Sequence, residues 1–491
     1  MLITACSDAE IIDGVLKEFA ELARIPRPSG QEKSVSDYLK KRFEALGLTV
    51  VQDEVYNIIA DLPASDGLED APRIILQCHM DMVCVADEGV VFDPLKDAIK
   101  LHRTETCLTA VGTSLGADDG MGIAAILCMI PSIQRTAHAP VRIICTVDEE
   151  RGMTGAIHLD SKYLQDAVYL INADSENYDE LTVGSAGSVN IDFSKRIERI
   201  APRFKQAWSV RITGLNGGHS GERIGDNRAN GASALASFFA NMESHDACEI
   251  AAFSAGTARN AIPASGEATF VTDAVEETLR TILMDTEKEL RAAYGMADPN
   301  IRLMLESVPM PISVADHAEA QTFLRLLRIL HSGVYAMSLQ SPLQVETSAN
   351  LGIARLDEEA ATVCFFPRSS NDAKIRSFIQ AAKDIAYMTG YRIDIGNVAP
   401  GWQEKPKSAL RNIMTEVFQE QNGRPMKVQT IHAGLECGYY AEKNPELDMV
   451  SIGVTTKDIH SPKESVILSS IPPIVRLMNE TLARIFAAER G

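Results

Sequence analysis

The run Arg73-Ile-Ile-Leu-Gln-Cys78 is apolar and rich in β-branched residues, and it leads directly into His79-Met-Asp81. Two further runs of this kind also end in acidic residues: Val141–Val147, before Asp148-Glu149-Glu150, and Ala167–Ile171, before Asn172-Ala-Asp174. Because each run follows or alternates with helical sequence, we expect buried strands of a largely parallel or mixed α/β sheet. Ligands collect beyond the carboxyl ends of the strands in open α/β sheets, so these three endings indicate one shared site.

A fourth acidic stretch, Ser114-Leu-Gly-Ala-Asp-Asp-Gly-Met-Gly122, places two adjacent carboxylates between glycines, just before the apolar helical run Ile123–Ile130. Adjacent carboxylates are costly to bring together unless a cation neutralises them, and oxygen-rich clusters of this kind hold divalent metals. Taken alone, the stretch also fits a structural turn with Asp at a helix N-cap. The acids and the histidine at the other strand ends favour the metal interpretation.

Composition limits the classes of function. A chain of 491 residues exceeds what one core supports, so we expect two or more domains. A formal charge of −20 argues against a nucleic-acid partner. Nine cysteines with no CxxC pair fit free thiols in the cytoplasm. The longest apolar run, Met121–Ile130, is too short to span a bilayer, so no membrane partner is expected.

The chain changes character after Gly187 and returns to its first style near Pro400. The intervening segment alternates helices and strands as an α+β layer that surrounds Gly217-Gly-His219-Ser-Gly221 and Thr257-Ala-Arg-Asn260. We therefore predict one α/β domain, formed by residues 1–186 and 400–491, interrupted by an inserted α+β domain over residues 187–399.

The candidate ligands are two imidazoles and three carboxylates: His79, His460, Asp118, Glu150 and Asp174. Mixed His and carboxylate sets suit Zn²⁺, or Mn²⁺ and Co²⁺ at similar sites. Five ligands are too many for one tetrahedral zinc ion with an open position, but they match two divalent metal ions that share one carboxylate. The sequence therefore predicts a two-metal hydrolase.

Two acids beside these ligands have predicted roles of their own. Asp81 lies two residues from His79 on the same side of an extended chain, where it can accept the other ring N–H. In the doublet Glu149-Glu150, one carboxylate can bind metal while its neighbour stays free to take a proton from the attacking water.

These residues together resemble the co-catalytic zinc peptidases of the M20 family, and within it the cytosolic aminoacyl-histidine (Xaa-His, carnosine-cleaving) dipeptidases. The resemblance follows the chain in order through HMDMV, SLGADDG, TARNAIP and HAGLECG, which begin at residues 79, 114, 257 and 432. It implies a mixed α/β catalytic domain with an inserted α+β lid domain, a small peptide substrate and a homodimer.

The resemblance also implies individual roles. His79 and Asp174 would hold one metal, Glu150 and His460 the other, with Asp118 bridging and Glu149 as the general base. The lid would carry three substrate contacts, His219, Asn260 and Arg368. Glu436 is a candidate for binding the substrate's amino group, with a helix-dipole role as the alternative. His432 is a further candidate for a place near the substrate.

Two departures and three alternatives accompany this hypothesis. The dipeptidase branch often has Asn at position 119 and Lys at position 86, where this chain has Asp119 and Ala86. The same family contains N-acyl amino acid deacylases, and a non-catalytic protein on this fold is a third possibility. Gly112-Thr-Ser114-Leu-Gly116 matches the nucleophile motif of serine hydrolases, which have no use for acids at three other strand ends.

Overall fold

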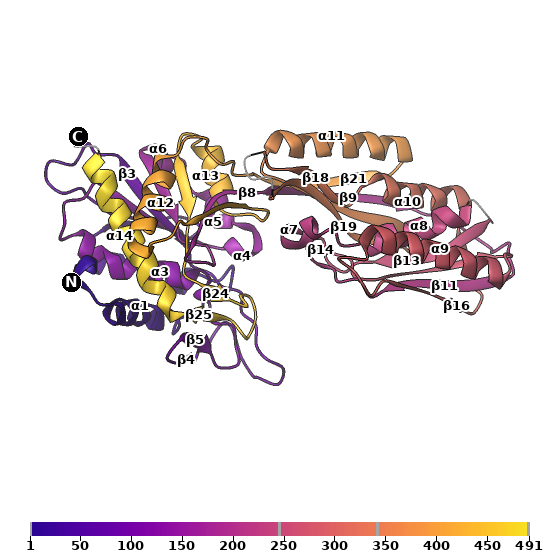
Figure 1. Ribbon diagram of the computed structural model, residues 1–491, viewed down its shortest axis with the longest axis horizontal. Helices are drawn as coiled ribbons and strands as arrows, with labels where there is room; N and C mark the ends of the chain where they lie inside the picture. Colours follow the sequence, from indigo (N-terminus) through magenta and orange to yellow (C-terminus); the bar gives the residue numbers. More distant parts are fainter. Residues whose placement is uncertain (1, 244–246, 340–342, 489–491) are drawn as a thin grey trace. The chain divides into compact units, whose positions relative to one another are not determined.

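The computed structural model describes residues 2–243, 247–339 and 343–488 (Figure 1). The chain divides into two compact units. Unit 1 comprises Met1–Gly184, Gln403–Thr430 and Glu436–Gly491, and unit 2 comprises Ser185–Trp402 and Ile431–Leu435. The predicted insertion, 187–399, lies entirely within unit 2, whereas the sequence does not indicate that residues 431–435 return to this unit.

Unit 1 is organised around an eight-stranded sheet with the order β1-β2-β6-β3-β7-β23-β8-β22. Its central strands are parallel, because β3 pairs in parallel with β6 and β7, and β7 with β23. In the order of the sheet, the strands are β1 (Thr49–Gln52), β2 (Ile58–Leu62), β6 (Val141–Thr146), β3 (Arg73–His79), β7 (Ala167–Asn172), β23 (Asp448–Ser451), β8 (Glu180–Ser185) and β22 (Lys427–Ile431). The predicted α/β fold class is confirmed.

The apolar runs become central strands because helices cover them. Ile74, Ile75 and Leu76 of β3 are fully buried, as continuous apolar runs in parallel sheets usually are. The apolar helix α3 packs against β3 and against α1 and α14. The helices of unit 1 are α1 (Asp8–Leu22), α2 (Lys33–Ala45), α3 (Ala117–Ile133), α4 (Glu149–Gly152), α5 (Thr154–His158), α6 (Lys162–Gln165), α12 (Ala409–Asn422), α13 (Cys437–Lys443) and α14 (Ile471–Ala488).

Smaller elements complete unit 1. Strands β24 (Thr456–Lys457), β25 (Ser465–Ile467), β5 (Cys107–Ala110) and β4 (Leu101–Arg103) form a four-stranded antiparallel sheet in that order. Single 3₁₀ turns lie at η1 (Ile3–Ala5) and η3 (Leu468–Ser470). Among the described helices of the whole chain, none has both the length and the apolar character needed to cross a membrane.

Unit 2 contains a nine-stranded sheet made of two similar halves. The path β16-β11-β15-β13-β19-β20-β9-β21 reads as one four-stranded order followed by its reverse, and β18 pairs with β19 in addition. In sequence order, the strands are β9 (Gly187–Arg196), β11 (Gln206–Thr213), β13 (Cys248–Ala255), β15 (Gly266–Thr272), β16 (Arg302–Ser307), β18 (Gly333–Met337), β19 (Val345–Leu356), β20 (Ala360–Ser369) and β21 (Arg392–Ala399).

Each half of unit 2 has the element order strand, helix, two strands, helix, strand. The first half is β11-α8-β13-β15-α9-β16, and the second is β9-α10-β19-β20-α11-β21. The halves join edge to edge where β13 pairs with β19, and the short pair β10 (Arg199–Ile200) and β17 (Val314–Ala315) brackets the first half. The helices are α7 (Ser220–Arg223), α8 (Gly231–Glu243), α9 (Glu276–Tyr294), α10 (His317–Ile329) and α11 (Asp372–Thr389), with a 3₁₀ turn at η2 (Ile224–Asp226). This repeat lies in the order of the elements, and the sequence indicates its second half less clearly than its first.

Candidate active site

Three neighbouring strands of unit 1 deliver side chains to one edge of the sheet. His79 is the last residue of β3, and its pairing partner Thr146 is the last residue of β6. After β6 the chain turns through Asp148, at φ 56°, into α4, which begins with Glu149 and Glu150. Asp174 follows β7 by two residues. The parallel arrangement therefore brings the predicted strand endings together.

The two carboxylate oxygens of Asp118 each face a different imidazole. Oδ1 lies 2.9 Å from His79 Nε2, and Oδ2 lies 3.3 Å from His460 Nε2. Asp174 Oδ1 lies 3.5 Å from His79 Nε2, and Glu150 Oε1 lies 2.8 Å from His460 Nε2. The five side chains therefore form two groups, each with one imidazole and one carboxylate, on either side of Asp118.

Negative charge dominates this site. Burial raises the pKa of Asp174 and of Glu149 well above the ordinary carboxyl range. Burial acts against protonation of His79, but the charges of Asp174 and Asp118 outweigh it and raise the pKa of the imidazole well above its usual value. Hydrogen bonds to Asp118 and Glu150 raise the pKa of His460 to about 10. The acidic groups of this cluster therefore favour protonated imidazoles or a bound cation.

The donor set fits divalent metal ions. One atom each from His79, Asp118 and Glu150 lies within 4.8 Å of the other two, close enough for a shared ion. A cavity of about 20 Å³ adjoins Asp118 and Asp174. Imidazole nitrogen mixed with carboxylate oxygen suits Zn²⁺, Mn²⁺ or Co²⁺, and a cation would offset the crowding of buried carboxylates.

Comparison with known proteins agrees with this geometry. Residues 75–484 match the description "Peptidase family M20/M25/M40". The chain belongs to this family. The chain is also similar to the cytosol non-specific dipeptidase of Escherichia coli (strain K12), with 32% identity over 469 residues, covering 95% of this chain and 96% of that protein. The predicted resemblance is confirmed, and the chain is a metal-dependent hydrolase of peptide bonds.

Two solved structures are similar to this chain in fold. The aminoacylhistidine dipeptidase of Vibrio alginolyticus has a TM-score of 0.89 and 30% sequence identity, covering 99% of this chain and 98% of that one. Human carnosine dipeptidase 1 shares the fold at a TM-score of 0.52 and 11% identity, covering 97% of this chain and 98% of that one.

In this M20 peptidase, Asp81 joins the first imidazole to the Glu149-Glu150 doublet. Its Oδ1 lies 3.3 Å from His79 Nδ1 and accepts the Glu149 backbone N–H at 3.0 Å, while Oδ2 accepts the Glu150 N–H at 3.2 Å. These interactions hold the pKa of the buried Asp81 at about 2, despite the opposing effect of burial. Asp81 is therefore an anion at neutral pH that orients the His79 ring and the backbone of the Glu149-Glu150 doublet.

The two glutamates of the doublet differ in their contacts. Glu150 reaches His460, as described above, whereas the Glu149 carboxylate accepts no hydrogen bond from any residue that the structure describes. This difference leaves Glu149 available to exchange protons.

In unit 2, Arg368 is a buried cation with no counter-ion among the described residues. Arg368 lies on β20 and is only 6% exposed. Its guanidinium lies over the ring of Phe366, 4.7 Å from the ring centroid. Within the described part of the chain, the guanidinium has neither an ion pair nor a hydrogen bond, and burial lowers its pKa to about 10. A buried guanidinium with free donors is costly unless an anion pairs with it.

His432 lies beside Arg368. Ser348 is the cross-strand partner of Arg368, and its hydroxyl lies 2.7 Å from His432 Nε2. Burial, aided by the charge of Arg368, lowers the pKa of His432 to about 3, so the imidazole is neutral at neutral pH. Unit 2 therefore offers a neutral imidazole next to an unpaired guanidinium.

The other two predicted lid residues lie together. The strand pair β12 (Gly218–His219) and β14 (Ala261–Ile262) sets His219 opposite Ala261, and the Asn260 carbonyl accepts the Ser220 N–H at 2.7 Å. His219 Nδ1 is buried without a hydrogen bond to any described residue. Burial, aided by the nearby charge of Arg368, lowers the pKa of His219, so its imidazole also favours the neutral form.

Glu436 has a different environment from the other candidates. It is fully buried in unit 1 at the N-cap of α13, where Oε2 accepts hydrogen bonds from Gln77 at 2.5 Å and Thr146 at 2.7 Å. Oε1 has no hydrogen-bond partner in the described chain, and burial raises the pKa of this carboxyl to about 7. Its two hydrogen bonds thus go to the sheet strands β3 and β6.

The serine-hydrolase alternative depends on Ser114 as the nucleophile. This serine is fully buried, and its hydroxyl donates to the Val83 carbonyl at 2.7 Å.

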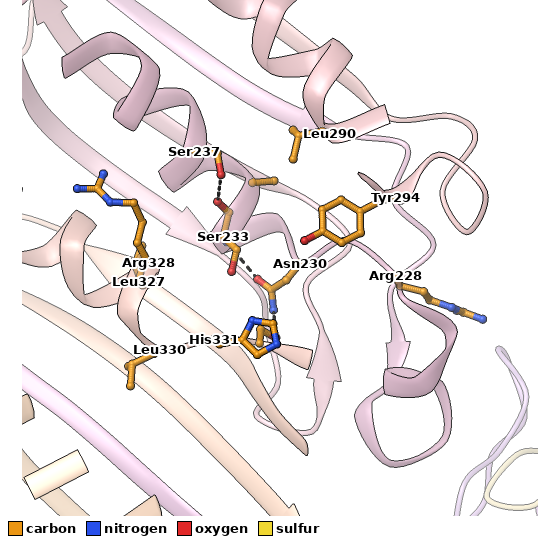
Figure 2. A pocket seen from close by; sticks show the side chains of 12 residues that line it. Arg228, Asn230, Ser233, Ser237, Leu290, Tyr294, Leu327, Arg328, Leu330 and His331 are labelled. Carbon is orange, nitrogen blue, oxygen red and sulfur yellow. Dashed lines mark hydrogen bonds between the residues drawn. The ribbon is translucent and has the colours of Figure 1, made fainter. Parts of the chain in front are cut away.

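A cavity of about 250 Å³ in unit 2 is lined by none of the predicted site residues (Figure 2). Its polar lining, which includes Asn230, Ser233, Ser237, Tyr294 and His331, is partly engaged in internal hydrogen bonds.

Sequence reasoning missed two buried residues that hold the loops of the site. The Arg27 guanidinium donates to the carbonyls of Met80 and Asp81, at 2.9 Å each, and to the carbonyl of Gly116. Glu464 accepts hydrogen bonds from the backbone around Asp118. Arg27 stands in a proline-flanked break and Glu464 in an ordinary loop, so neither had a spacing signal.

Proposed function

We propose that the protein is a cytoplasmic dipeptidase that hydrolyses free dipeptides of the Xaa-His type. The observation that carries this proposal is the unpaired, buried guanidinium of Arg368, because a guanidinium recognises a terminal carboxylate through two parallel hydrogen bonds. The names of the two relatives, a cytosol non-specific dipeptidase and an aminoacylhistidine dipeptidase, both support a dipeptide substrate, and the second supports histidine within it. We further propose that it acts as a homodimer.

We assign the metal ligands from the two groups around Asp118. His79 and Asp174 would hold one divalent ion, Glu150 and His460 would hold the other, and Asp118 would bridge them. Zn²⁺ is our first choice, with Mn²⁺ and Co²⁺ as alternatives. When bound, the pair of ions supplies positive charge that polarises the scissile carbonyl and lowers the pKa of water.

The chain's own residues supply the proton transfers. Glu149, which accepts no hydrogen bond within the described chain, would take a proton from the attacking water and return it to the amine that leaves. Asp81 would keep the backbone of Glu149 in place and fix the orientation of His79.

Unit 2 would supply the substrate contacts. Arg368 would bind the carboxylate of the dipeptide, with neutral His432 and Ser348 beside it. His219 and Asn260 would bind the polar groups of the reacting amide, where a donor to the oxyanion has most effect. Glu436 remains our candidate for the substrate's amino group through its unpaired Oε1.

A substrate panel tests this function. The purified protein is assayed with Xaa-His dipeptides, other dipeptides, dipeptide amides and N-acyl amino acids, before and after treatment with a chelator and after addition of Zn²⁺ or Mn²⁺. We expect cleavage of free dipeptides that the chelator abolishes and metal restores. Hydrolysis of N-acyl amino acids without cleavage of dipeptides would replace this function with that of a deacylase.

A further inference from the structure

Glu464 is a buried acid placed between the two loops that carry Asp118 and His460. It is only 2% exposed and immediately precedes β25 in unit 1. Its backbone N–H donates to the Ser461 carbonyl at 3.1 Å, which closes the turn directly after His460. Its side chain points to a different part of the sequence, nearly 350 residues away.

The Glu464 carboxylate accepts four consecutive backbone N–H groups. Oε2 accepts those of Leu115 at 2.7 Å and Gly116 at 3.0 Å, and Oε1 accepts those of Ala117 at 2.8 Å and Asp118 at 3.4 Å. These four residues lie just before and at the N-terminus of α3, where orphan N–H groups and the helix dipole favour an anion. Each carboxylate oxygen therefore accepts two hydrogen bonds, and the N–H of Asp118 itself is one of the four donors.

The turn bound by Glu464 is closely packed. Gly116 adopts φ 69°, and a side chain there would meet Met82 Sδ at 2.5 Å and the Arg27 guanidinium at 2.6 Å. Its N–H is held by Glu464 and its carbonyl by Arg27. Gly116, two residues before Asp118, is therefore held at both its N–H and its carbonyl.

His460 depends on the same link. Its side chain is 43% exposed, so little packing holds it, and its backbone has a positive φ of 58° within the turn that ends at Glu464. The Glu464 carboxylate therefore links this turn to the Asp118 loop by hydrogen bonds, in addition to the contact of the His460 side chain with Asp118.

We propose that Glu464 is a positioning residue that sets the distance between Asp118 and His460 and thereby the affinity for divalent metal. The proposal rests on the metal assignment made above and adds a residue to it. Residues behind metal ligands typically change metal affinity by about 10- to 100-fold when they are replaced. A purely structural acid that only caps α3 would change the stability of the fold and leave metal affinity unaltered.

The substitution Glu464→Gln separates these roles. Glutamine has nearly the same shape, but its amide nitrogen is a donor and would face two N–H donors in either orientation, because both carboxylate oxygens are occupied. Glu464→Asp retains the charge and draws the carboxylate back by one methylene. Glu105→Gln is the matched control, since Glu105 is an exposed acid in the turn between β4 and β5 of the same small sheet.

The experiment measures metal binding rather than turnover. Wild-type protein and the three variants are titrated with Zn²⁺ against a chromophoric chelator, and the visible spectrum of each Co²⁺-loaded protein reports ligand geometry. Unfolding in urea reports stability. We expect Glu464→Gln to bind at least one ion about 10- to 100-fold more weakly, with an altered Co²⁺ spectrum, while Glu105→Gln matches the wild type.

The outcomes separate this inference from the proposed function. Wild-type protein that binds no metal would overturn both. If the wild type binds two ions and Glu464→Gln binds them with unchanged affinity and spectrum, only the positioning role is overturned, even if stability falls. Should Glu464→Gln fail to fold, Glu464→Asp decides: weaker binding with an altered spectrum supports the role, and wild-type binding contradicts it.

Discussion

His79 and Asp118 stand 39 residues apart in the sequence, yet Nε2 of the imidazole lies 2.9 Å from Oδ1 of the carboxylate. The contact exists because β3 ends at the edge of the sheet where α3 begins, and it leaves the second oxygen of Asp118 directed at His460. This division of one carboxylate between two imidazoles is the geometric basis on which we propose two metal positions.

Glu149→Gln should retain metal and lose turnover. Glu149 accepts no hydrogen bond within the described chain, so its loss removes a proton acceptor and not a ligand. A general base contributes about 10² to 10⁴ in rate, and kcat should fall by that factor. Metal analysis provides the check, with Glu150→Gln as the matched control that should lose metal. A Glu149→Gln protein depleted of metal would reverse the assignment of the two glutamates.

Arg368→Ala should impair free dipeptides selectively. Loss of charge-assisted hydrogen bonds to the carboxylate should lower kcat/KM by about 10- to 150-fold, mainly through KM. A dipeptide amide lacks the carboxylate, so it should be a poor substrate for the wild type and lose little more in the variant. Arg368→Lys, which keeps the charge but not the paired donors, should be intermediate. Equal rates for acid and amide with the wild type would remove this anchor from the mechanism.

His219→Ala should lower kcat by about 10² to 10³ with a smaller effect on KM, as expected for a donor to the oxyanion. His219 lies in unit 2 and Glu149 in unit 1, so mixing this variant with Glu149→Gln tests whether the imidazole acts within its own subunit, in which case no activity should return. Activity regained in verified mixed dimers would show that the imidazole acts across subunits.

Glu436 should make the stability of the metal-free protein depend on pH. Burial raises its pKa to about 7 from an ordinary value of 4.5, so the folded chain keeps a proton that the unfolded chain releases between these values. This contribution is fully present below about pH 4.5 and is lost as pH rises through about 7, by up to about 3 kcal/mol.

Glu436→Gln tests that dependence. Glutamine can keep the acceptor for Gln77 and Thr146 and cannot ionise. In urea titrations with chelator present, the free energy of unfolding of the variant should gain on that of the wild type as pH rises from 4.5 to 7, the two pKa values above. Parallel pH profiles would contradict the prediction. A steep loss of activity toward free dipeptides, but not toward N-acyl substrates, would support contact with the amino group.

The sequence predicted the centre of the fold because local patterns define it. The apolar runs of β3, β6 and β7 end in His79, Glu149-Glu150 and Asp174, and parallel pairing places such endings at one edge. The link between Glu464 and Leu115–Asp118 could not be predicted in this way, because a side chain that binds distant backbone leaves no periodicity. The edge-to-edge joining of the two halves of unit 2 was unpredictable for a similar reason, since it depends on pairing between β13 and β19 and not on composition.

The most direct measurement is a crystal structure of the Zn²⁺-loaded protein with anomalous diffraction recorded at the zinc edge. Our account predicts two strong anomalous peaks on either side of Asp118, about 3.5 to 4 Å apart, one near His79 and Asp174 and the other near Glu150 and His460. A single peak, or peaks bound to other side chains, would contradict the assignment of Asp118 as the shared ligand.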